Sequence, residues 1–409
     1  MKYIVVLGDG MADRPLKALG GKTCLEKAHK PGMDHIARNG RMGLLRTLRD
    51  DMPLGSDIAN LSVLGYDPKK YYSGGRGPLE AAAMGISLED GDIAFRANLI
   101  TAENGRIKDY SGGHVSSVES AELIAFLNRK IGSEDMRFYP GVSYRNLMVL
   151  KKSGVLHSDL EEKPPHDLMD QKIVDNLIKA EDENAQGVAD RLNDIMTGTQ
   201  ALLSQHPVNK KRIAEKKDPA NMLWVWGGGS KPKMPSFREK YGIKGSLISA
   251  VDLLRGIAVY AGLEVIDVPG ATGYLDTDYS AKAEHALKSL EDNDYVYIHV
   301  EAPDEAGHEG LVKEKVKAIE DIDEMIVSRI LKEMDGKEYR IAILPDHATP
   351  IEARTHTSEP VPFAVYSSGG AEKGDGMSYS EKNAADGSYG LVEGKDFMDL
   401  FIKGRIKEK

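Results

Sequence analysis

Six side chains that could bind divalent metal ions stand next to short apolar segments of the sequence. Three are carboxylates and three are imidazoles; in chain order they are Asp9, Asp304, His308, Asp346, His347 and His356. Carboxylate oxygens and imidazole nitrogens together form the mixed donor set that suits Mn²⁺ or Zn²⁺. Each residue alone also has an ordinary explanation, as a turn cap or a surface group. Their shared placement at the ends of apolar segments indicates one site that could hold a pair of divalent metal ions.

The spacing within two of these segments matters for metal binding. Asp304 and His308 are four positions apart, so they can face the same way on a helical turn and converge on one cation. Asp346 and His347 are adjacent, and adjacent residues at a strand end normally point apart. They would serve one metal ion only if the chain turns sharply there.

A candidate nucleophile, Ser56, stands in the segment PLGSDIAN. Its position is typical of a helix N-cap, which is its ordinary structural explanation. The same position places a hydroxyl in the positive potential of a helix N-terminus, which favours an alkoxide and a bound phosphate. Coordination to a metal ion would lower its pKa further and supply a nucleophile without a separate base. Ser56 is therefore either a structural helix cap or a metal-activated nucleophile for phosphoryl transfer.

Short buried strands alternate with helical patterns along much of the chain. The expected strands are Tyr3–Leu7, Met222–Trp226, Leu263–Val268, Tyr295–Val300, Arg340–Leu344 and Val361–Val365. The expected helices include Ser246–Ala261 and Val312–Glu333. Such alternation predicts a mostly parallel α/β sheet flanked by helices. Because functional residues gather at the carboxyl ends of the strands in such sheets, we expect the candidate ligands to lie together.

The middle of the chain differs in composition and predicts an inserted α+β domain over residues 66–235. It contains Gly-rich turns, a charged helical stretch at Asp170–Asn193 and a Lys-rich connection at Asn209–Lys217. Residues 1–65 and 236–409 would then form the metal-binding domain. A length of 409 residues suits two domains. The Gly-, Pro- and Lys-containing borders are candidate hinges.

Composition excludes several classes of protein. A formal charge of -10 argues against a nucleic-acid partner, which usually needs a basic face. No apolar stretch approaches the ~20 residues of a membrane span, and the first apolar run, YIVVL, is too short for a secretory signal. The single cysteine, Cys24, excludes an intramolecular disulfide and suits a reducing compartment. We therefore expect a cytoplasmic protein with neither a nucleic-acid nor a membrane partner, and its oligomeric state is left open. A small phosphorylated metabolite as partner is suggested instead by the position of Ser56 at a helix N-terminus.

The order of these residues resembles the alkaline phosphatase superfamily and, within it, the cofactor-independent phosphoglycerate mutases of the shorter archaeal type. The resemblance spans nearly the whole chain, in the segments VVLGDGMADRP, PLGSDIANLSVLGYDP, GRGPLEAA, YPGVSYR, VEAPDEAGH and LPDHATP. It implies an alkaline-phosphatase-like fold and an isomerase, an intramolecular phosphotransferase of glycolysis and gluconeogenesis. Such an enzyme interconverts 3-phosphoglycerate and 2-phosphoglycerate without 2,3-bisphosphoglycerate, through a phosphoserine intermediate.

The resemblance also implies roles for individual residues. One divalent metal ion would be held by Asp9, Ser56, Asp346 and His347, and a second by Asp304, His308 and His356. Members of the family use Mn²⁺, Zn²⁺, Mg²⁺ or Co²⁺, and we expect Mn²⁺ or Zn²⁺ here. The inserted domain would bind the rest of the substrate and close over it to exclude water. The candidate substrate-binding residues are His114, Arg145, Arg76, Lys231 and Lys282.

Two alternatives keep this chemistry and change the phosphoryl acceptor. One is a homoserine kinase-like phosphotransferase of the same family, and the other is a metal-dependent phosphatase or phosphonate hydrolase that uses water. The glycine-rich segments GGRGP and WGGGSK lack the GxxxxGK[ST] spacing of a Walker A loop, which weakens the kinase alternative. A binding protein without catalysis is disfavoured because Ser56 accompanies the full ligand set.

Overall fold

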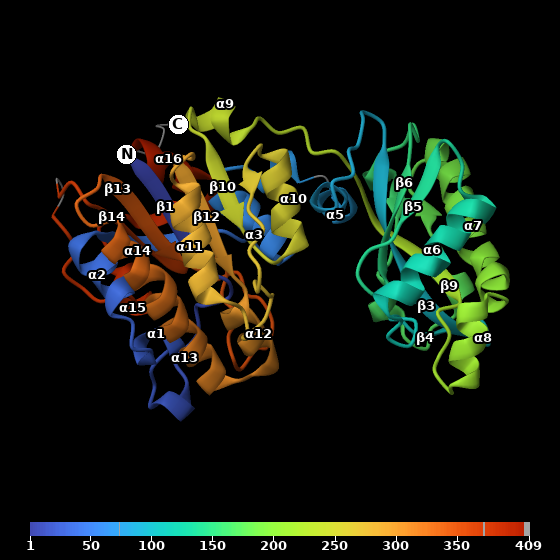
Figure 1. Cartoon of the computed structure of the whole chain (residues 1–409), viewed down its shortest axis with the longest axis horizontal. Coiled ribbons are helices and arrows are strands. Elements are labelled where there is room, and N and C mark those ends of the chain that lie inside the picture. Colours follow the sequence, from blue (N-terminus) through green and yellow to red (C-terminus); the bar gives the residue numbers. More distant parts are fainter. Residues whose placement is uncertain (73, 371–372, 405–409) are drawn as a thin grey trace. The chain divides into compact units, whose positions relative to one another are not determined.

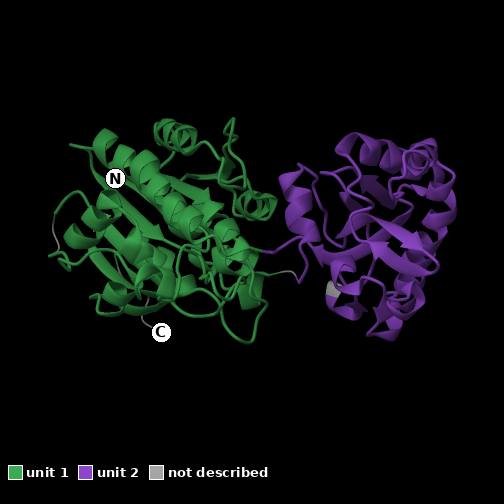
Figure 2. Ribbon diagram, turned by 90° about the horizontal axis from the view of Figure 1, so that it is seen from below, with its two compact units in different colours: residues 1–72, 234–409 green, residues 73–233 purple. Residues whose placement is uncertain are grey.

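The computed structural model describes residues 1–72, 74–370 and 373–404, and the chain divides into two compact units (Figure 2). Unit 1 comprises Met1–Tyr72 and Met234–Lys409, and unit 2 comprises Ser73–Lys233. The expected insert began at residue 66, but residues 66–72 belong to unit 1. Tyr66 is fully buried there, and the ammonium of Lys240 lies 4.7 Å from the centre of its ring.

Unit 1 contains an eight-stranded sheet in the order β11-β10-β12-β1-β13-β14-β2-β15. From β11 to β13 all neighbouring strands are parallel, whereas β14 is antiparallel to both β13 and β2. The predicted mostly parallel sheet is therefore confirmed. The strands are β1 (Lys2–Gly8), β2 (Arg41–Arg46), β10 (Gly245–Ile248), β11 (Glu264–Val265), β12 (Tyr295–Val300), β13 (Tyr339–Leu344), β14 (Val361–Ser367) and β15 (Gly390–Glu393).

Helices cover this sheet, and its central strands are largely apolar, as parallel strands buried on both faces usually are. Every residue of β12 is buried. In Figure 1, α2, α11 and α14 lie in front of the sheet, and their buried side chains share one core with those of β1 and β12. The helices are α1 (Cys24–Lys27), α2 (Pro31–Asn39), α3 (Ser56–Val63), α4 (Pro68–Tyr71), α9 (Phe237–Tyr241), α10 (Asp252–Tyr260), α11 (Tyr279–Ser289), α12 (Ala302–Glu309), α13 (Val312–Asp321), α14 (Ser328–Glu333), α15 (Glu381–Ala385) and α16 (Phe397–Lys403).

Two element predictions in unit 1 need correction, and a third is confirmed in its extent. The helix expected over Ser246–Ala261 is wrong in its first part, because Gly245–Ile248 forms the buried strand β10 and α10 begins only at Asp252. A short apolar run does not distinguish a buried strand from a buried helix. The strand expected at Leu263–Val268 is reduced to the two residues of β11. The helix expected over Val312–Glu333 is continuous, but its middle, Ile322–Val327, is π-helical.

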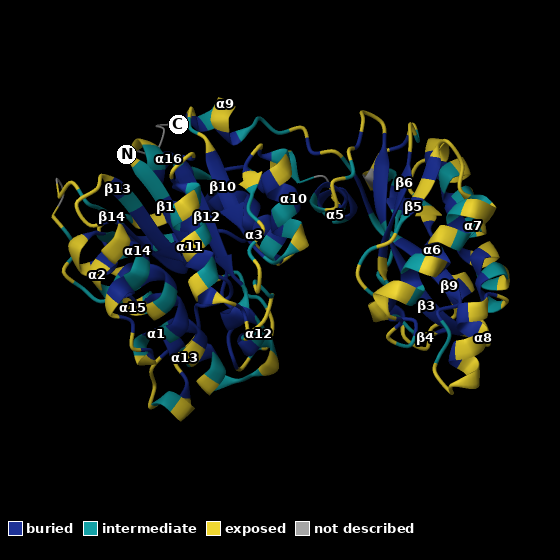
Figure 3. Ribbon diagram, viewed as in Figure 1, coloured by how far each residue is buried: buried dark blue, intermediate teal, exposed yellow. Residues whose placement is uncertain are grey.

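Unit 2 has an antiparallel sheet of five strands packed against helices, an α+β arrangement as predicted for the insert. The strands are β3 (Ile93–Glu103), β4 (Arg106–Asp109), β5 (Met136–Tyr139), β6 (Arg145–Leu150) and β9 (Met222–Ser230), with a separate pair β7 (Leu160–Glu161) and β8 (Lys179–Ala180). The helices are α5 (Gly77–Ala83), α6 (Ser117–Ile131), α7 (Gln186–Ser204) and α8 (Pro207–Ala214). Figure 3 shows the buried residues concentrated on the strands of each unit and the exposed ones on the outer helical surfaces.

Two predictions in unit 2 were also wrong. The charged stretch Asp170–Asn193 is not one helix, because α7 begins only at Gln186. The Lys-rich segment Asn209–Lys217 is not an open connection, because most of it belongs to α8. Its residue Arg212 is almost completely buried, with a side chain only 3% exposed.

Candidate metal centre

The seven expected metal ligands all lie where the central strands of unit 1 end. Strand β1 stands between β12 and β13 and is parallel to both, so the carboxyl ends of the three strands share one edge of the sheet. Asp9 directly follows β1, Asp304 lies in the first turn of α12 after β12, and Asp346 follows β13. The sheet order therefore brings together residues that are far apart in the sequence.

One group of donor atoms surrounds Nε2 of His347. The hydroxyl oxygen of Ser56 lies 3.1 Å from this nitrogen, Oδ1 of Asp9 lies 3.3 Å away and Oδ2 of Asp346 lies 3.5 Å away. Asp9, Asp346 and His347 are completely buried. The adjacent pair Asp346 and His347 thus does serve one place, because the chain leaves the sheet in an irregular turn after β13.

A second group is formed by Asp304, His308 and His356. Oδ2 of Asp304 is 3.2 Å from Nε2 of His308, and Oδ1 is 3.6 Å from Nε2 of His356. The two Nε2 atoms lie 3.0 Å apart. Nδ1 of His308 lies 3.1 Å from the carbonyl oxygen of Arg354, and Nδ1 of His356 lies 3.1 Å from that of Leu54. When both Nδ1 atoms donate to these carbonyls, both Nε2 lone pairs point at the same place, as in a metal site.

The two groups are contiguous. Donor atoms of Asp9, Asp304 and His347 all lie within 4.8 Å of one another. Thr349 connects the groups, because its hydroxyl donates to Oδ1 of Asp304 and lies 3.3 Å from Nδ1 of His347. Gly10 has to be glycine here: its φ is +57°, and a Cβ atom would lie only 2.3 Å from Oδ1 of Asp304.

The candidate metal centre contains several buried carboxylates close together, an arrangement that a bound cation would stabilise. Burial raises the pKa of Asp9 well above its usual value, and the charges of Asp346, Glu301 and Asp304 raise it further. The pKa of Glu301 is raised to about 8, mainly by burial. Oδ1 of Asp9 accepts no hydrogen bond from the described residues, although it is buried. Clustered buried carboxylates are stable when ionised only if positive charge is close, so these residues fit bound divalent ions.

Ser56 occupies a different helical position from the one predicted. The N-cap of α3 is Gly55, and Ser56 is the first helical residue. Among the described residues, no backbone nitrogen is found to donate to its hydroxyl, which instead faces His347. The hydroxyl is therefore not occupied by a structural role at the helix end, while it keeps the position at the N-terminus that favours bound phosphate.

Two residues that support the ligands were missed by the sequence analysis. Nε2 of His299 lies 2.9 Å from Oδ2 of Asp9, and its Nδ1 lies 3.3 Å from the hydroxyl of Ser249. Burial lowers the pKa of His299 to about 3, so the ring is neutral and Nε2–H donates to Asp9. Asn60 donates to Oδ2 of Asp346 at 2.7 Å. A histidine inside the otherwise apolar strand YVYIHV was a signal, whereas Asn60 had none beyond its spacing from Ser56.

Two of the expected substrate-binding residues lie close to a common neighbour in unit 2. Arg76 is half-buried before α5, Arg145 is exposed at the start of β6, and both carry charge close to Arg96 of β3, whose side chain is 12% exposed. Burial lowers the pKa of the Arg96 guanidinium, and the charges of Arg76 and Arg145 lower it further. Arg96 is a third cation of this cluster, which the sequence analysis missed; it also pairs with Glu80 at 3.1 Å.

His114 lies in a tightly held loop of the same unit. Its φ of 52° is unusual for a residue other than glycine, and its side chain is exposed. The carboxylate of Asp109 accepts hydrogen bonds from the backbone nitrogens of Ser111 and Gly113, at 2.7 and 2.9 Å. Arg212 donates to the carbonyl oxygens of Gly112 and Gly113. The loop therefore presents His114 in a fixed backbone conformation.

The two candidate lysines lie in different environments. Lys231 is exposed directly after β9 in unit 2, and no hydrogen bond or ion pair with another described residue is found for it. Lys282 is completely buried in unit 1 and donates to the carbonyl oxygen of His299 at 2.9 Å. Burial lowers its pKa to about 8. Lys282 thus lies behind β12, next to a residue that supports Asp9, rather than at the surface.

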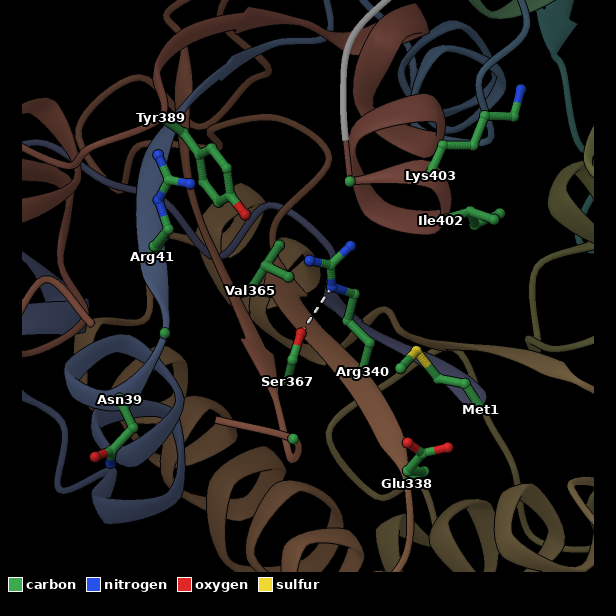
Figure 4. Close-up of a pocket in the computed structure, with 13 residues that line it drawn as sticks. Met1, Asn39, Arg41, Glu338, Arg340, Val365, Ser367, Tyr389, Ile402 and Lys403 are labelled. Atoms are coloured by element: carbon green, nitrogen blue, oxygen red, sulfur yellow. Dashed lines mark hydrogen bonds between the residues drawn. The ribbon is translucent and has the colours of Figure 1, made fainter. Parts of the chain in front are cut away.

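A cavity of about 420 Å³ lies elsewhere in unit 1, at the ends of β13 and β14 (Figure 4). Arg340 points into it and donates to the hydroxyl of Ser367 and to the carbonyl of Phe401, at 2.8 and 2.9 Å. Lys403, on its rim, pairs with Asp399. Arg340 is near the start of β13 and Asp346 follows its end, so this cavity is separate from the candidate metal centre.

Comparison with known proteins decides the family. The family model described as 2,3-bisphosphoglycerate-independent phosphoglycerate mutase matches residues 37–209. A protein of that name from Methanosarcina barkeri is 50% identical over 407 residues, covering 99% of this chain and 100% of the relative. The chain belongs to the 2,3-bisphosphoglycerate-independent phosphoglycerate mutase family. The resemblance carried by the motifs is therefore confirmed.

Other members of the family are similar over the same length. A protein from Geobacter sulfurreducens, named a probable 2,3-bisphosphoglycerate-independent phosphoglycerate mutase, is 47% identical and covers 98% of this chain and 100% of its own. Among solved structures, the cofactor-independent phosphoglycerate mutase of Thermoplasma acidophilum matches with a TM-score of 0.70 at 27% identity, over 98% of this chain and 99% of that one. A protein from Pyrococcus horikoshii matches with a TM-score of 0.84 at 31% identity, over 100% and 98%. Within the described part of the chain, no helix is long and apolar enough to span a membrane.

Proposed function

We propose that this chain is a 2,3-bisphosphoglycerate-independent phosphoglycerate mutase, an isomerase that interconverts 3-phosphoglycerate and 2-phosphoglycerate through a phosphoserine on Ser56. The family of the chain supports this activity over the homoserine kinase-like and hydrolase alternatives. The observation that carries the proposal is the hydroxyl of Ser56, 3.1 Å from Nε2 of His347 and within the first group of donor atoms. A nucleophile among metal-ligand candidates is what phosphoryl transfer through the protein requires.

The donor set fits two divalent ions. Asp9, Ser56, Asp346 and His347 would hold one, and Asp304, His308 and His356 would hold the other. When bound, the ions would neutralise phosphate oxygens and favour the alkoxide of Ser56. Two divalent ions carry four positive charges against the three carboxylates of the set, which leaves a positive charge to attract a phosphate dianion before Ser56 ionises. Mn²⁺ or Zn²⁺ suits this donor set best, with Mg²⁺ and Co²⁺ as further candidates.

The reaction needs only transfers between oxygens. The Ser56 hydroxyl loses its proton and its oxygen attacks the phosphorus of 3-phosphoglycerate. The bond from phosphorus to the C3 oxygen of glycerate breaks, and that oxygen takes up a proton. The C2 hydroxyl then loses its proton and attacks the phosphoserine, the bond from phosphorus to the Ser56 oxygen breaks, and Ser56 is reprotonated. The N-terminus of α3 contributes positive potential at the phosphoryl group in both steps.

We further propose that unit 2 recognises the glycerate portion. Arg76, Arg96 and Arg145 form a local excess of positive charge, which suits the carboxylate of phosphoglycerate. His114 would add a hydrogen bond from its fixed loop. Roles in substrate binding for Lys231 and Lys282 stay predictions, as does a cytoplasmic location.

One assay separates the candidate functions. The protein loaded with Mn²⁺ is incubated with 3-phosphoglycerate in the absence of 2,3-bisphosphoglycerate and followed by ³¹P NMR, which resolves 3-phosphoglycerate, 2-phosphoglycerate and inorganic phosphate. We expect 2-phosphoglycerate. Inorganic phosphate alone would instead identify a phosphatase, and O-phosphohomoserine formed from ATP and homoserine would identify a kinase. The Ser56→Ala variant is the control, and turnover by that variant would remove the phosphoserine mechanism.

A further inference from the structure

A fully buried lysine lies beneath the candidate metal centre, and the proposed chemistry does not use it. The side chain of Lys315, on α13, has no exposed surface. Its ammonium donates to Oδ2 of Asp13 at 3.0 Å, to the carbonyl oxygen of Ala12 at 3.2 Å and to that of Thr349 at 2.8 Å. An ammonium has three N–H groups, so each has one acceptor.

The acceptors belong to two loops that carry candidate ligands. Ala12 and Asp13 lie in the loop that begins with Asp9, and Thr349 lies in the loop that begins with Asp346. Asp13 also ties these loops together directly, because its carboxylate accepts from the backbone nitrogen of Ile351 at 3.3 Å. Lys315 itself follows α12, the helix that carries Asp304 and His308.

The same loops meet in irregular backbone pairing. Ala348 forms isolated β-bridges with Met11, with Ala12 and with Thr357, the neighbour of His356. Lys315 binds the carbonyl oxygens of Ala12 and of Thr349, which are at or next to these bridges. One ammonium therefore fixes the crossing of the loops at a place where no regular strand ladder holds them.

An ion pair in such a place needs a reason other than stability. Removing two charges from water costs several kcal/mol per ion, and apolar replacements of similar volume are often neutral or stabilising. Geometric specificity can offset that cost, because an ammonium that donates to three acceptors in fixed directions favours one arrangement of the loops.

We propose that Lys315 and Asp13 are positioning residues of the two-metal centre: their buried ion pair holds the loops of Asp9 and of Asp346 and His347 in the arrangement that binds metal. This inference rests on the proposed function, since it concerns the same centre. Neither residue would touch the substrate. They act by setting the backbone from which the ligands project, as partners of metal ligands do in other sites.

The test measures Mn²⁺ binding directly. The EPR signal of free aqueous Mn²⁺ is titrated with metal-free wild-type protein and with the Lys315→Met and Asp13→Asn variants, at a temperature where circular dichroism shows them folded. We expect each variant to bind Mn²⁺ about 10- to 100-fold more weakly, the usual effect of losing a group that orients ligands. Mutase activity should recover at saturating Mn²⁺, with KM for 3-phosphoglycerate unchanged. A purely structural role would lower the melting temperature without this change in affinity.

Lys30→Met is the matched control. Lys30 is another buried lysine of unit 1, with a side chain 4% exposed, and it pairs with Asp34 of α2 at 2.7 Å rather than with a ligand loop. The Lys30→Met variant should have a lower melting temperature than the wild type and the same affinity for Mn²⁺. If Lys315→Met does not fold, the Asp13→Asn variant provides the test. Its side-chain amide removes the negative charge but keeps an oxygen that can accept the hydrogen bond from the backbone nitrogen of Ile351.

The outcomes separate the two proposals. Unchanged Mn²⁺ affinity in the folded variants, or an equal loss in Lys30→Met, overturns the positioning role. Failure of the wild-type protein to bind Mn²⁺ would instead overturn the proposed metal centre itself.

Discussion

The hydrogen bond between Tyr297 and Asn60 allows a test of how buried hydrogen bonds hold Asp346 and the backbone at Ser56 in place. The Tyr297 hydroxyl donates to Oδ1 of Asn60 at 2.5 Å, and the Asn60 amide donates to Asp346 at 2.7 Å and to the Ser56 carbonyl at 2.8 Å. Both side chains are fully buried. The perturbation is a double-mutant cycle made of Tyr297→Phe, Asn60→Ala and the double variant.

The expected energies follow from which buried groups lose a partner. Tyr297→Phe leaves one buried acceptor unsatisfied, which costs about 1–3 kcal/mol. Asn60→Ala costs more, because it leaves the Tyr297 hydroxyl without its acceptor and Asp346 without a donor. In that background, Tyr297→Phe removes the hydroxyl that has lost its partner and should cost little. The double variant should therefore be more stable than the sum of the single effects predicts, by about 1–3 kcal/mol.

Urea denaturation of the metal-free protein measures this difference, provided that the units are followed separately. The two tryptophans, Trp224 and Trp226, both belong to unit 2, so tryptophan fluorescence reports unit 2 alone. Far-UV circular dichroism reports both units, and a transition absent from the fluorescence belongs to unit 1. The substitutions should shift only that transition. Additivity to within about 0.3–0.5 kcal/mol would refute the reasoning, since it would mean that the two side chains act independently.

Three further predictions concern individual residues. His299→Ala should weaken Mn²⁺ binding about 10- to 100-fold in a titration, because Asp9 loses the donor that orients it; unchanged affinity would contradict that role. In the metal-free protein the pKa of His308 is raised to about 9, mainly by its hydrogen bond to Asp304, above an unfolded value near 6.5. Its stabilising effect is therefore complete below about pH 6.5 and is lost as pH rises to about 9, so melting curves of wild type and His308→Gln should converge with rising pH. Arg96→Met should raise KM for 3-phosphoglycerate and leave Mn²⁺ affinity unchanged; a shifted Mn²⁺ titration would contradict a role confined to substrate.

The sequence predicted the parts of the site that stand at the ends of elements. Asp9, Asp304 and Asp346 are polar residues that interrupt apolar runs, and that contrast is visible without coordinates. The mostly parallel sheet was predictable for the same reason, because its central strands are largely apolar. The strand β10 was misassigned because its apolar residues run on into those of a helix.

The residues that support the candidate ligands could not be predicted from the sequence, because their roles depend on neighbours in the folded structure. His299 and Arg96 lie inside strands, and the sequence shows each only as a polar residue within an apolar segment. What gives His299 its role is Asp9, 290 positions away in the sequence. Lys315 is a similar case, since its three acceptors come from loops about 300 and 34 positions away. Patterns of spacing within one element do not encode such contacts.

The same crowding of carboxylates that suits metal ions should make unit 1 depend on them for stability. Asp9 is buried with an oxygen that accepts no hydrogen bond from the described residues, and burial together with the neighbouring carboxylates raises its pKa. A ligand that binds only the folded state stabilises it by about 2.7 kcal/mol at a concentration 100 times its Kd. We therefore expect Mn²⁺ to move the unit 1 transition in circular dichroism to higher urea and to leave the fluorescence transition of unit 2 in place. A Mn²⁺ effect of equal size on both transitions would show that the ions act outside the site around Ser56.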